Sequence, residues 1–514
     1  MSDNALIHQQ YLQQLQGLET FRQAYQGVFP TAALERDDPE LKRLTEAIAY
    51  CTAHAQHSAH CALQSHHQML VEHIHPYMVS PLAAKTIVQV IPDAKLQQSY
   101  DLAPGCRFEL KSEEQSSANF ITCMPLTILP LQYHQFELVS QGSNRLKLTL
   151  GFSGFVTMEQ QSPEIPIYLN VFNDLNATLA LYNALIADDV VAELYFEGEQ
   201  TSRSCQLGHK SCQFRPRMHP IETIRNALHF PYAQFFVYVR LLETPAKWRS
   251  FNLVLSIKSQ QSLQNINQDC FRPFCTPMIN LSQRAAQNIW CDGTKSQYPL
   301  LNEDLTEDAA IHSVLGVYQQ VNEQKTPLIP SVIHQGNNTF ALLTGTKNRL
   351  QIDLSIADAF TNPRNVIIDA LWHQPNFSRV LWQKLTVMPF DIDIPGVQWQ
   401  LSEARQLCVV TSDAEDKLTL FELLAIRSNE VVSAALLNQL FYLFSATLAA
   451  EFAPVVEGFT GVKATSEQAS FVFEVALANS NMAIGELFLA YFQAAANDWF
   501  AVDNIRLTLG QVIK

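Results

Sequence analysis

Residues 218–281 read MHPIETIRNALHFPYAQFFVYVRLLETPAKWRSFNLVLSIKSQQSLQNINQDCFRPFCTPMINL, and this stretch decides the fold. A short helical segment ends at Phe230-Pro231, two aromatic-rich strands follow, and the chain then returns through apolar residues interrupted by prolines. An aromatic ring buries roughly 150–250 Å² when it lies inside a protein. The stretch therefore predicts the centre of a hydrophobic core, and it contains no pattern typical of catalysis. Its clustered rings are Phe230, Phe235, Phe236, Tyr238, Trp248 and Phe251.

The order of motifs in this stretch carries a family resemblance. Phe230-Pro231 is followed by aromatic β residues from Phe235 to Tyr238 and, after a polar gap, by Cys275-Thr276-Pro277-Met278-Ile279-Asn280-Leu281. This order resembles TssF (VasA/ImpG-like) proteins, which are baseplate subunits of the bacterial type VI secretion system. The segment Tyr77–Val90 and the strand–helix–strand pattern near the C-terminus are similar to the same family.

Composition limits the functions open to the chain. Of its 514 residues, 47% are hydrophobic and only 16% are charged, against about 25% charged in typical soluble domains. So few charges predict that partners cover part of the surface. The net charge of −15 argues against a protein that follows nucleic-acid phosphates, which would need a basic surface.

Targeting signals are absent from the sequence pattern. The N-terminus lacks a charged segment followed by an apolar one, so no signal peptide is predicted. The longest apolar region, at about 436–450, is shorter than the ~20 residues that a membrane span needs. The 10 cysteines follow no disulfide spacing, which fits reduced thiols. We therefore expect a cytoplasmic protein, docked at the inner membrane through the baseplate that the resemblance implies.

Two helices are predicted at the start of the chain, over residues 5–28 and from Pro39 to about His75. The second would be roughly 50 Å long at 1.5 Å per residue. Its residues of one face recur at alternating spacings of three and four, which is typical of a coiled-coil or bundle seam. This seam consists of Leu41, Leu44, Ile48, Cys51, Ala55, Ser58, Ala62, Ser65 and Met69.

Two interpretations of the seam are open. The long helix can form a hairpin with residues 5–28, or it can pack against helices of other subunits. Its central residues are small, so a partner helix could approach closely. The family resemblance favours the second interpretation, because it implies that the N-terminal helices join a bundle between subunits. The predicted partner-binding residues are Leu41, Leu44, Ile48, Cys51, Ala55, Ala62 and Met69.

The remaining chain is predicted to be rich in β-structure. Leu146, Leu148 and Leu150 alternate with polar residues, a pattern typical of a strand that buries one face. Beyond residue 340, strand and helix patterns are mixed. The sequence therefore predicts an α+β fold with four parts: an N-terminal helical region at 1–80, a β-rich middle domain at 81–290, a linker or small subdomain at 291–340, and a C-terminal α+β domain at 341–514.

Histidines and cysteines offer candidate metal ligands. His54, His57 and Cys61 lie within about 60° on a helical wheel and could bind zinc, but no fourth ligand is evident. A solvated helix face with pH-dependent charge is the simpler interpretation. Cys205, Cys212, Cys270, Cys275 and Cys291 lack a Cys-x-x-Cys spacing, and no metal or cofactor is predicted.

Asp391 and Asp393 form the other candidate site. Paired carboxylates can bind a divalent ion or act in acid–base catalysis. The alternative is an exposed strand face with Ile392 and Ile394 pointing inward. No supporting catalytic group accompanies the pair, so the chain is not predicted to be an enzyme.

The family resemblance implies a structural role. Such a subunit would assemble with TssG-like, TssE-like and TssK-like subunits and a second copy of itself into a wedge around a VgrG spike. The baseplate would dock on the membrane complex and prime assembly of the contractile sheath and tube. Two alternatives stay open: a wedge protein of a phage-derived contractile tail, and a soluble β-rich carbohydrate-active enzyme that uses Asp391 and Asp393.

Overall fold

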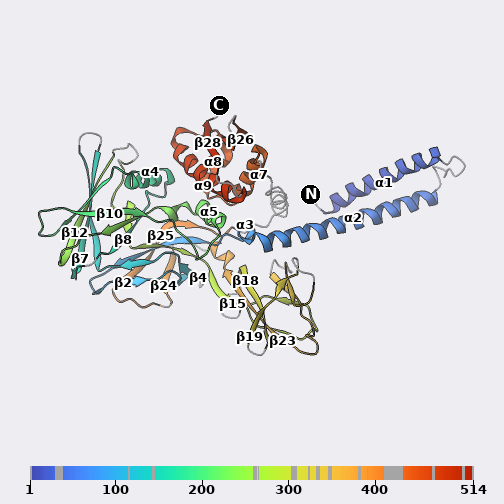
Figure 1. The fold of residues 1–514 in the computed structure, drawn as a ribbon, viewed down its shortest axis with the longest axis horizontal. Coiled ribbons are helices and arrows are strands. Elements are labelled where there is room, and N and C mark those ends of the chain that lie inside the picture. The colour runs from blue at the N-terminus through green and yellow to red at the C-terminus, as the bar shows by residue number, and fades with distance from the viewer. Residues whose placement is uncertain are drawn as a thin grey trace. The chain divides into compact units, whose positions relative to one another are not determined.

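The fold combines helices at both ends of the chain with β-sheets in its middle, which confirms the predicted α+β class (Figure 1). The computed structural model describes residues 3–28, 39–113, 116–141, 145–160, 162–258, 263, 265–302, 309–321, 324–331, 336–344, 350–379, 384–390, 392–409, 432–465, 469–500 and 504–511.

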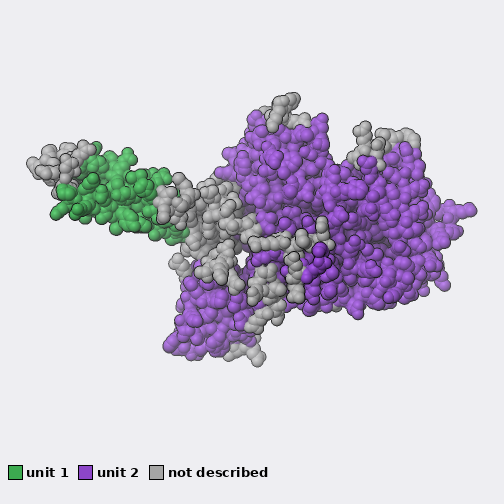
Figure 2. Space-filling model, turned by 180° about the vertical axis from the view of Figure 1, so that it is seen from behind, with its two compact units in different colours: residues 1–74, 413–421 green, residues 75–412, 422–514 purple. Residues whose placement is uncertain are grey.

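The described residues 3–28 and 39–74 belong to one compact unit, shown in green in Figure 2. Helix α1 (Asp3–Val28) runs back alongside α2 (Pro39–Ile74), so the two form a hairpin. Ala49 and Ala53 of α2 are fully buried, and their small side chains let α1 come close. The amide nitrogen of Gln14 donates to the amide oxygen of Gln56 at 3.1 Å across the hairpin.

The second unit contains two large antiparallel sheets. One has eight strands in the order β13-β8-β11-β10-β9-β12-β7-β6, and the other has six in the order β24-β3-β4-β14-β1-β25. The eight are β6 (Leu131–Ser140), β7 (Arg145–Glu159), β8 (Glu164–Leu169), β9 (Val191–Phe196), β10 (Arg203–His209), β11 (Phe236–Leu241), β12 (Lys247–Lys258) and β13 (Phe271–Pro273). The six are β1 (Lys85–Pro92), β3 (Arg107–Ser112), β4 (Ser117–Thr122), β14 (Cys275–Ile279), β24 (Leu385–Pro389) and β25 (Val397–Gln406), and a small pair joins β2 (Tyr100–Leu102) to β5 (Leu126–Ile128).

Phe274 is the corner at which the chain passes from one large sheet to the other. Its φ of 57° is left-handed, which is unusual for a bulky residue and turns the strand sharply. Its N–H donates to the carbonyl of Pro166 (3.1 Å), and its carbonyl accepts from the N–H of Val90 (2.9 Å). One backbone residue thus bonds to both sheets, and the six aromatic rings predicted to be core are all buried.

Helix α5 (Pro220–His229) packs against the C-terminal helix α9 (Met482–Phe500). His219 caps its N-terminus by accepting from the N–H of Ile221. The buried Arg225 donates to the carbonyls of Tyr77 (2.6 Å) and Ser80 (3.3 Å), so it holds the short helix α3 (Pro76–Val79) in place.

Residues between β14 and β24 form a β-sandwich. One sheet contains β15, β16, β18, β19 and β23, the other β17, β20, β21 and β22, and a shared apolar core lies between them. The strands are β15 (Ser282–Ala285), β16 (Ile289–Cys291), β17 (Gln297–Pro299), β18 (Ala310–Val321), β19 (Gln324–Pro327), β20 (Ile329–Pro330), β21 (Thr339–Thr344), β22 (Leu350–Ser355) and β23 (Arg364–His373).

The predicted four-part division stays a prediction, but strand pairing crosses two of its boundaries. Strand β25, from the expected C-terminal domain, pairs with β1 of the expected middle domain. The sandwich core also includes residues on both sides of positions 291 and 341. These pairings join residues far apart in the sequence, so local patterns carry little sign of them.

The C-terminal part places helices against a three-stranded sheet. Helices α7 (Ala434–Ser445), α8 (Ala453–Gly458) and α9 accompany the strands β26 (Phe459–Ala464), β27 (Ser470–Val475) and β28 (Arg506–Gln511). Phe441 and Phe444 lie in an aromatic core with Phe473, Phe488 and Phe492, whereas Tyr442 is 62% exposed. A further helix, α4 (Leu175–Ile186), packs on α9.

Two buried amides fasten the chain where it enters and leaves the sandwich. Asn280 lies near the end of the family-like signature, and Gln374 follows β23, 94 residues further along the chain. Asn280 accepts from the N–H of Gln374 (2.6 Å) and donates to the carbonyl of Asn119 (2.8 Å). Gln374 in turn accepts from the N–H of Asn119 (2.9 Å) and donates to the carbonyl of Ser117 (2.9 Å).

Replacing Asn280 with alanine is expected to lower the free energy of unfolding by about 2–4 kcal/mol, because buried backbone groups lose their side-chain partner. The measurement is the unfolding free energy by chemical denaturation. Gln398→Ala removes an exposed amide from β25 and serves as the matched control, with an expected change within about 0.5 kcal/mol. Equal effects of the two substitutions would contradict the role of the Asn280–Gln374 pair.

Candidate partner-binding surface

The predicted seam of α2 lies on the surface of the helical hairpin. Leu44 is 58% exposed and Ile48 is 46% exposed, and Cys51, Ala55 and Ala62 are exposed as well. The side chains of Leu41 and Met69 lie outside the described side chains. The described seam residues therefore form an apolar stripe that the hairpin itself does not cover.

The seam and the hairpin contact occupy opposite faces of α2. Taking about 100° per residue, the described seam residues lie about 120–180° away from the buried pair Ala49 and Ala53. Both interpretations of the helix are therefore compatible: α1 covers one face, and the other stays free for another helix. The small residues Cys51, Ala55 and Ala62 at the middle of the seam allow close approach of helix axes.

The described histidine side chains of α2 form no metal-binding cluster. The Sγ atom of Cys61 lies 3.6 Å from Nε2 of His57, one helical turn away. Among the described residues, no three histidine, cysteine or acidic side chains are placed to hold a metal ion. The side chains of His66, His67 and His73 lie outside those that the structure describes.

The acidic pair offers one described carboxylate. Asp391 lies outside the described residues, and Asp393 is exposed in a segment without strand pairing, beside the buried Ile394. The structure therefore brings no acid–base partner to Asp393 within the part of the chain it describes. All 10 cysteines are free thiols, and Cys212, Cys270, Cys275 and Cys291 are buried as small apolar side chains.

One buried basic residue, Lys85, was not identified from the sequence. Lys85 of β1 is fully buried, and its Nζ lies 2.9 Å from Nδ1 of His229 and 3.2 Å from the carbonyl of Ala83. Loss of hydration lowers the pKa of Lys85 to about 7 and holds the pKa of His229 well below its ordinary value. No local pattern marks Lys85, because alternation in β1 would place a lysine on the solvent side.

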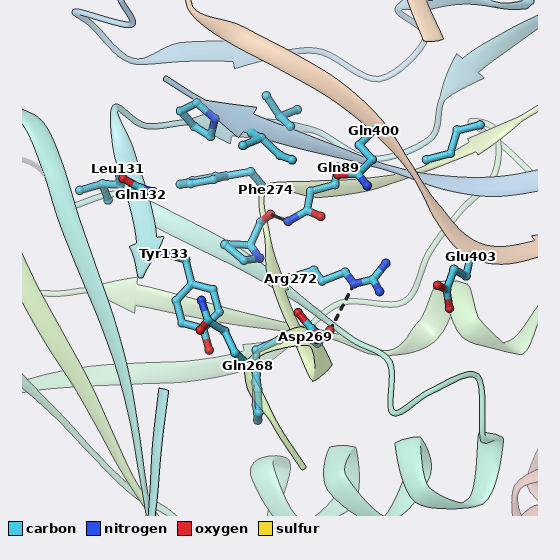
Figure 3. A pocket seen from close by; sticks show the side chains of 16 residues that line it. Gln89, Leu131, Gln132, Tyr133, Gln268, Asp269, Arg272, Phe274, Gln400 and Glu403 are labelled. Atoms are coloured by element: carbon cyan, nitrogen blue, oxygen red, sulfur yellow. Dashed lines mark hydrogen bonds between the residues drawn. The ribbon is translucent and has the colours of Figure 1, made fainter. Parts of the chain in front are cut away.

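The described surface also has two adjoining cavities beside β25. The first, of about 350 Å³, lies among β1, β6, β13 and β25, and the second, of about 520 Å³, lies between β24 and β25. Figure 3 shows the side chain of Arg272 in the first cavity, between Asp269 and Glu403. No nucleophile–base pair accompanies these groups among the lining residues, so the cavities have the features of a binding groove.

No described helix is both long and apolar enough to span a membrane.

Comparison with known proteins decides the family. The family model described as "Type VI secretion system, TssF" matches residues 21–342, well over half of the chain. The chain belongs to the TssF family. The match begins within α1 and ends within β21, so it includes the α2 seam, the Phe274 corner and most of the sandwich.

A curated relative supports the assignment. The type VI secretion system component TssF1 of Pseudomonas aeruginosa PAO1 is 27% identical over 374 residues. That match covers 64% of this chain and 60% of the relative's own length, so it spans less than two thirds of the relative.

Two solved structures share the TssF fold. A chain of the type VI secretion TssK-TssF-TssG baseplate subcomplex, determined by cryo-electron microscopy, is similar with a TM-score of 0.68. The likeness covers 92% of this chain and 96% of that chain at 14% sequence identity. A chain of the type VI secretion baseplate complex gives a TM-score of 0.56 over 99% of this chain and 97% of that chain, also at 14% identity.

Replacing Lys85 with methionine is expected to remove a pH dependence of stability. Above pH 7 the unfolded chain keeps a proton on Lys85 that the folded protein releases, because burial lowers the folded-state pKa to about 7. The wild-type free energy of unfolding should therefore rise by up to roughly 1 kcal/mol per pH unit from this group. Chemical denaturation at pH 7 and pH 8 measures the rise for wild type and variant.

Lys95→Met is the control, because Lys95 is exposed. The upper limit of pH 8 leaves out most of the titration of the half-buried Cys408 thiol. Loss of hydration raises the pKa of this thiol to about 11, and its effect on stability has the opposite sign. Identical pH dependence in wild type and Lys85→Met would show that Lys85 is charged in both folded and unfolded states.

Proposed function

We propose that this chain is a non-enzymatic structural subunit of a type VI secretion baseplate wedge. The observation that carries the proposal is the exposed seam of α2 in a TssF-family chain: Leu44 and Ile48 lie on the face opposite to the one that α1 covers. An apolar stripe of this kind is stabilised when another helix covers it.

The partners follow from the family. A solved relative is part of a TssK-TssF-TssG subcomplex, and we propose that this chain assembles with TssG-like and TssK-like subunits in the same way. The proposal extends to a TssE-like subunit, a second copy of this chain and a VgrG spike. The assembly would be cytoplasmic and docked at the inner membrane through the baseplate, where it primes sheath and tube assembly.

The seam is the proposed binding surface for partner helices. Its residues are Leu41, Leu44, Ile48, Cys51, Ala55, Ala62 and Met69, within the proposed bundle region 1–80. The role is mechanical: large interfaces supply the free energy of assembly, and rearranged subunit contacts supply the switch. The family assignment favours this role over a phage-derived tail wedge, and the exposed, unaccompanied Asp393 gives no support to a carbohydrate-active enzyme.

Replacing Leu44 and Ile48 with aspartate is expected to abolish co-purification with a TssG-like partner. Two charges within the seam would have to be buried without partners, which costs several kcal/mol. Both side chains are exposed in the hairpin, so the helix content and thermal unfolding of the isolated chain should be unchanged. The measurement is recovery of a tagged partner after co-expression.

Tyr50→Asp is the matched control. Tyr50 is an exposed apolar residue of the same helix, and it lies about 120° around α2 from the seam. Its variant should co-purify like wild type. Undiminished recovery of the partner by the Leu44→Asp, Ile48→Asp chain would contradict the proposed seam.

A further inference from the structure

The six-stranded sheet nearly closes on itself but leaves a gap. Its two end strands, β24 and β25, lie side by side, and the ring of Trp399 contacts that of Phe108 with a centroid distance of 4.8 Å. Within the described residues, β24 pairs only with β3, and β25 pairs only with β1. Each end strand therefore presents a row of backbone donors and acceptors toward the gap.

The register identifies which groups of β25 face the gap. Val90 donates its N–H to Phe274, away from β25, and Val90 lies opposite Trp399. Orientation alternates along an antiparallel ladder, so the N–H and C=O of Trp399 and Leu401 point away from β1. No described backbone group bonds to the N–H of Leu401.

At this point β25 carries a bulge in its pairing with β1. Leu401 lies opposite Val88 and Arg405 opposite Thr86, so three residues of β25, Ser402–Ala404, stand where β1 has one. Such bulges change the direction in which side chains point, and they are frequent beside functional sites. The cavity of about 520 Å³ follows this segment, with Leu385 of β24 on its other side, and the cavity of about 350 Å³ adjoins it through Gln400, Leu401 and Glu403.

Unusual backbone conformations surround the two cavities. Phe274 (φ 57°) lines the first and Asn173 (φ 58°) lines the second, and the neighbouring Phe172 (φ 52°) is 61% exposed. Left-handed conformations of residues other than glycine cost free energy and gather at binding sites. Here the surrounding contacts fix them: the hydroxyl of Tyr232 donates to the carbonyl of Asn173 at 2.6 Å.

The groups that line the cavities match a peptide backbone better than an ion. Arg272 and Arg405 are balanced by Asp269 and Glu403, so these four side chains carry no net charge. Among the described residues, Arg272 donates to two neutral acceptors, the carbonyl of Asp269 and the hydroxyl of Ser402, at 3.2 Å each. Both donors and acceptors are offered by the lining glutamines Gln89, Gln132, Gln268 and Gln400.

We propose that this groove binds an extended, uncharged segment of a partner polypeptide as an added strand on the free edge of β25. Backbone bonds to Trp399 and Leu401 supply the affinity, and the adjoining cavity takes one side chain of the segment. A peptide backbone carries both N–H and C=O groups, and the lining glutamines offer partners for both. The occupant is thus defined by its extended backbone and lack of net charge.

A selection from a displayed library of random ten-residue peptides, with the full chain as the target, tests this proposal. Enriched peptides should have little net charge and should bind Leu401→Pro at least tenfold more weakly, because proline lacks the outward N–H. Leu401→Val keeps that N–H and should bind them like wild type. Failure to enrich any peptide, or enriched peptides that bind Leu401→Pro as tightly as wild type, would overturn the proposal.

Hydrogen exchange on the wild-type chain provides a test that needs no variant. With an enriched peptide bound, the amides of Trp399 and Leu401 should exchange at least tenfold more slowly. The amide of Gln400 points toward β1 and should change little, since it is already bonded within the sheet. Unchanged exchange at both outward amides in the presence of saturating peptide would show that the edge is not the binding site.

Discussion

A single extended segment, Phe271–Ile279, belongs to both large sheets, and the rest of the second unit depends on it. Strand β13 pairs with β8 in one sheet and β14 pairs with β1 and β4 in the other, so the chain must turn at Phe274 between them. The turn costs backbone strain, which the hydrogen bonds to Pro166 and Val90 and the burial of the Phe274 ring offset. Asn280, the residue directly after β14, then fixes the point where the chain enters the sandwich.

The helical unit is subject to a different constraint. A helix can cover only one side of its neighbour, and α2 carries apolar or small residues on two opposite sides. Ala49 and Ala53 are buried against α1, whereas Leu44 and Ile48 lie on the exposed side of α2. The hairpin covers the first side and leaves the second exposed, and this second side is the one proposed to bind partner helices.

Parts of the fold could be predicted from local sequence patterns. The 3.5-residue repeat predicted the long helix, and the clustered rings of residues 230–251 predicted the core that the structure contains. The face of α2 that meets α1 could not be predicted, because alanine is too weakly apolar to form a visible stripe. Phe441 and Phe444 lie in the core, whereas the neighbouring Tyr442 is exposed.

Other features lack any local signal. The Asn280–Gln374 pair joins residues 94 positions apart, and each residue alone resembles an ordinary loop amide. The sandwich was predicted as a linker or small subdomain followed by another domain, because its strands pair across long separations. Lys85 and the left-handed Phe274 depend on tertiary surroundings that alternation and turn chemistry do not describe. The free edge of β25 likewise becomes visible only once the order of strands is known.

The reactivity of two native thiols tests the central claim most directly. Cys51 lies on the α2 seam, Cys61 lies about 80° from it around the same helix, and both are exposed in the isolated chain. Alkylation of each cysteine can be followed by peptide mass spectrometry, in the isolated chain and after assembly with TssG-like and TssK-like partners. The account predicts that assembly slows alkylation of Cys51 at least tenfold and leaves Cys61 reactive. Equal reactivity of Cys51 before and after assembly would contradict it.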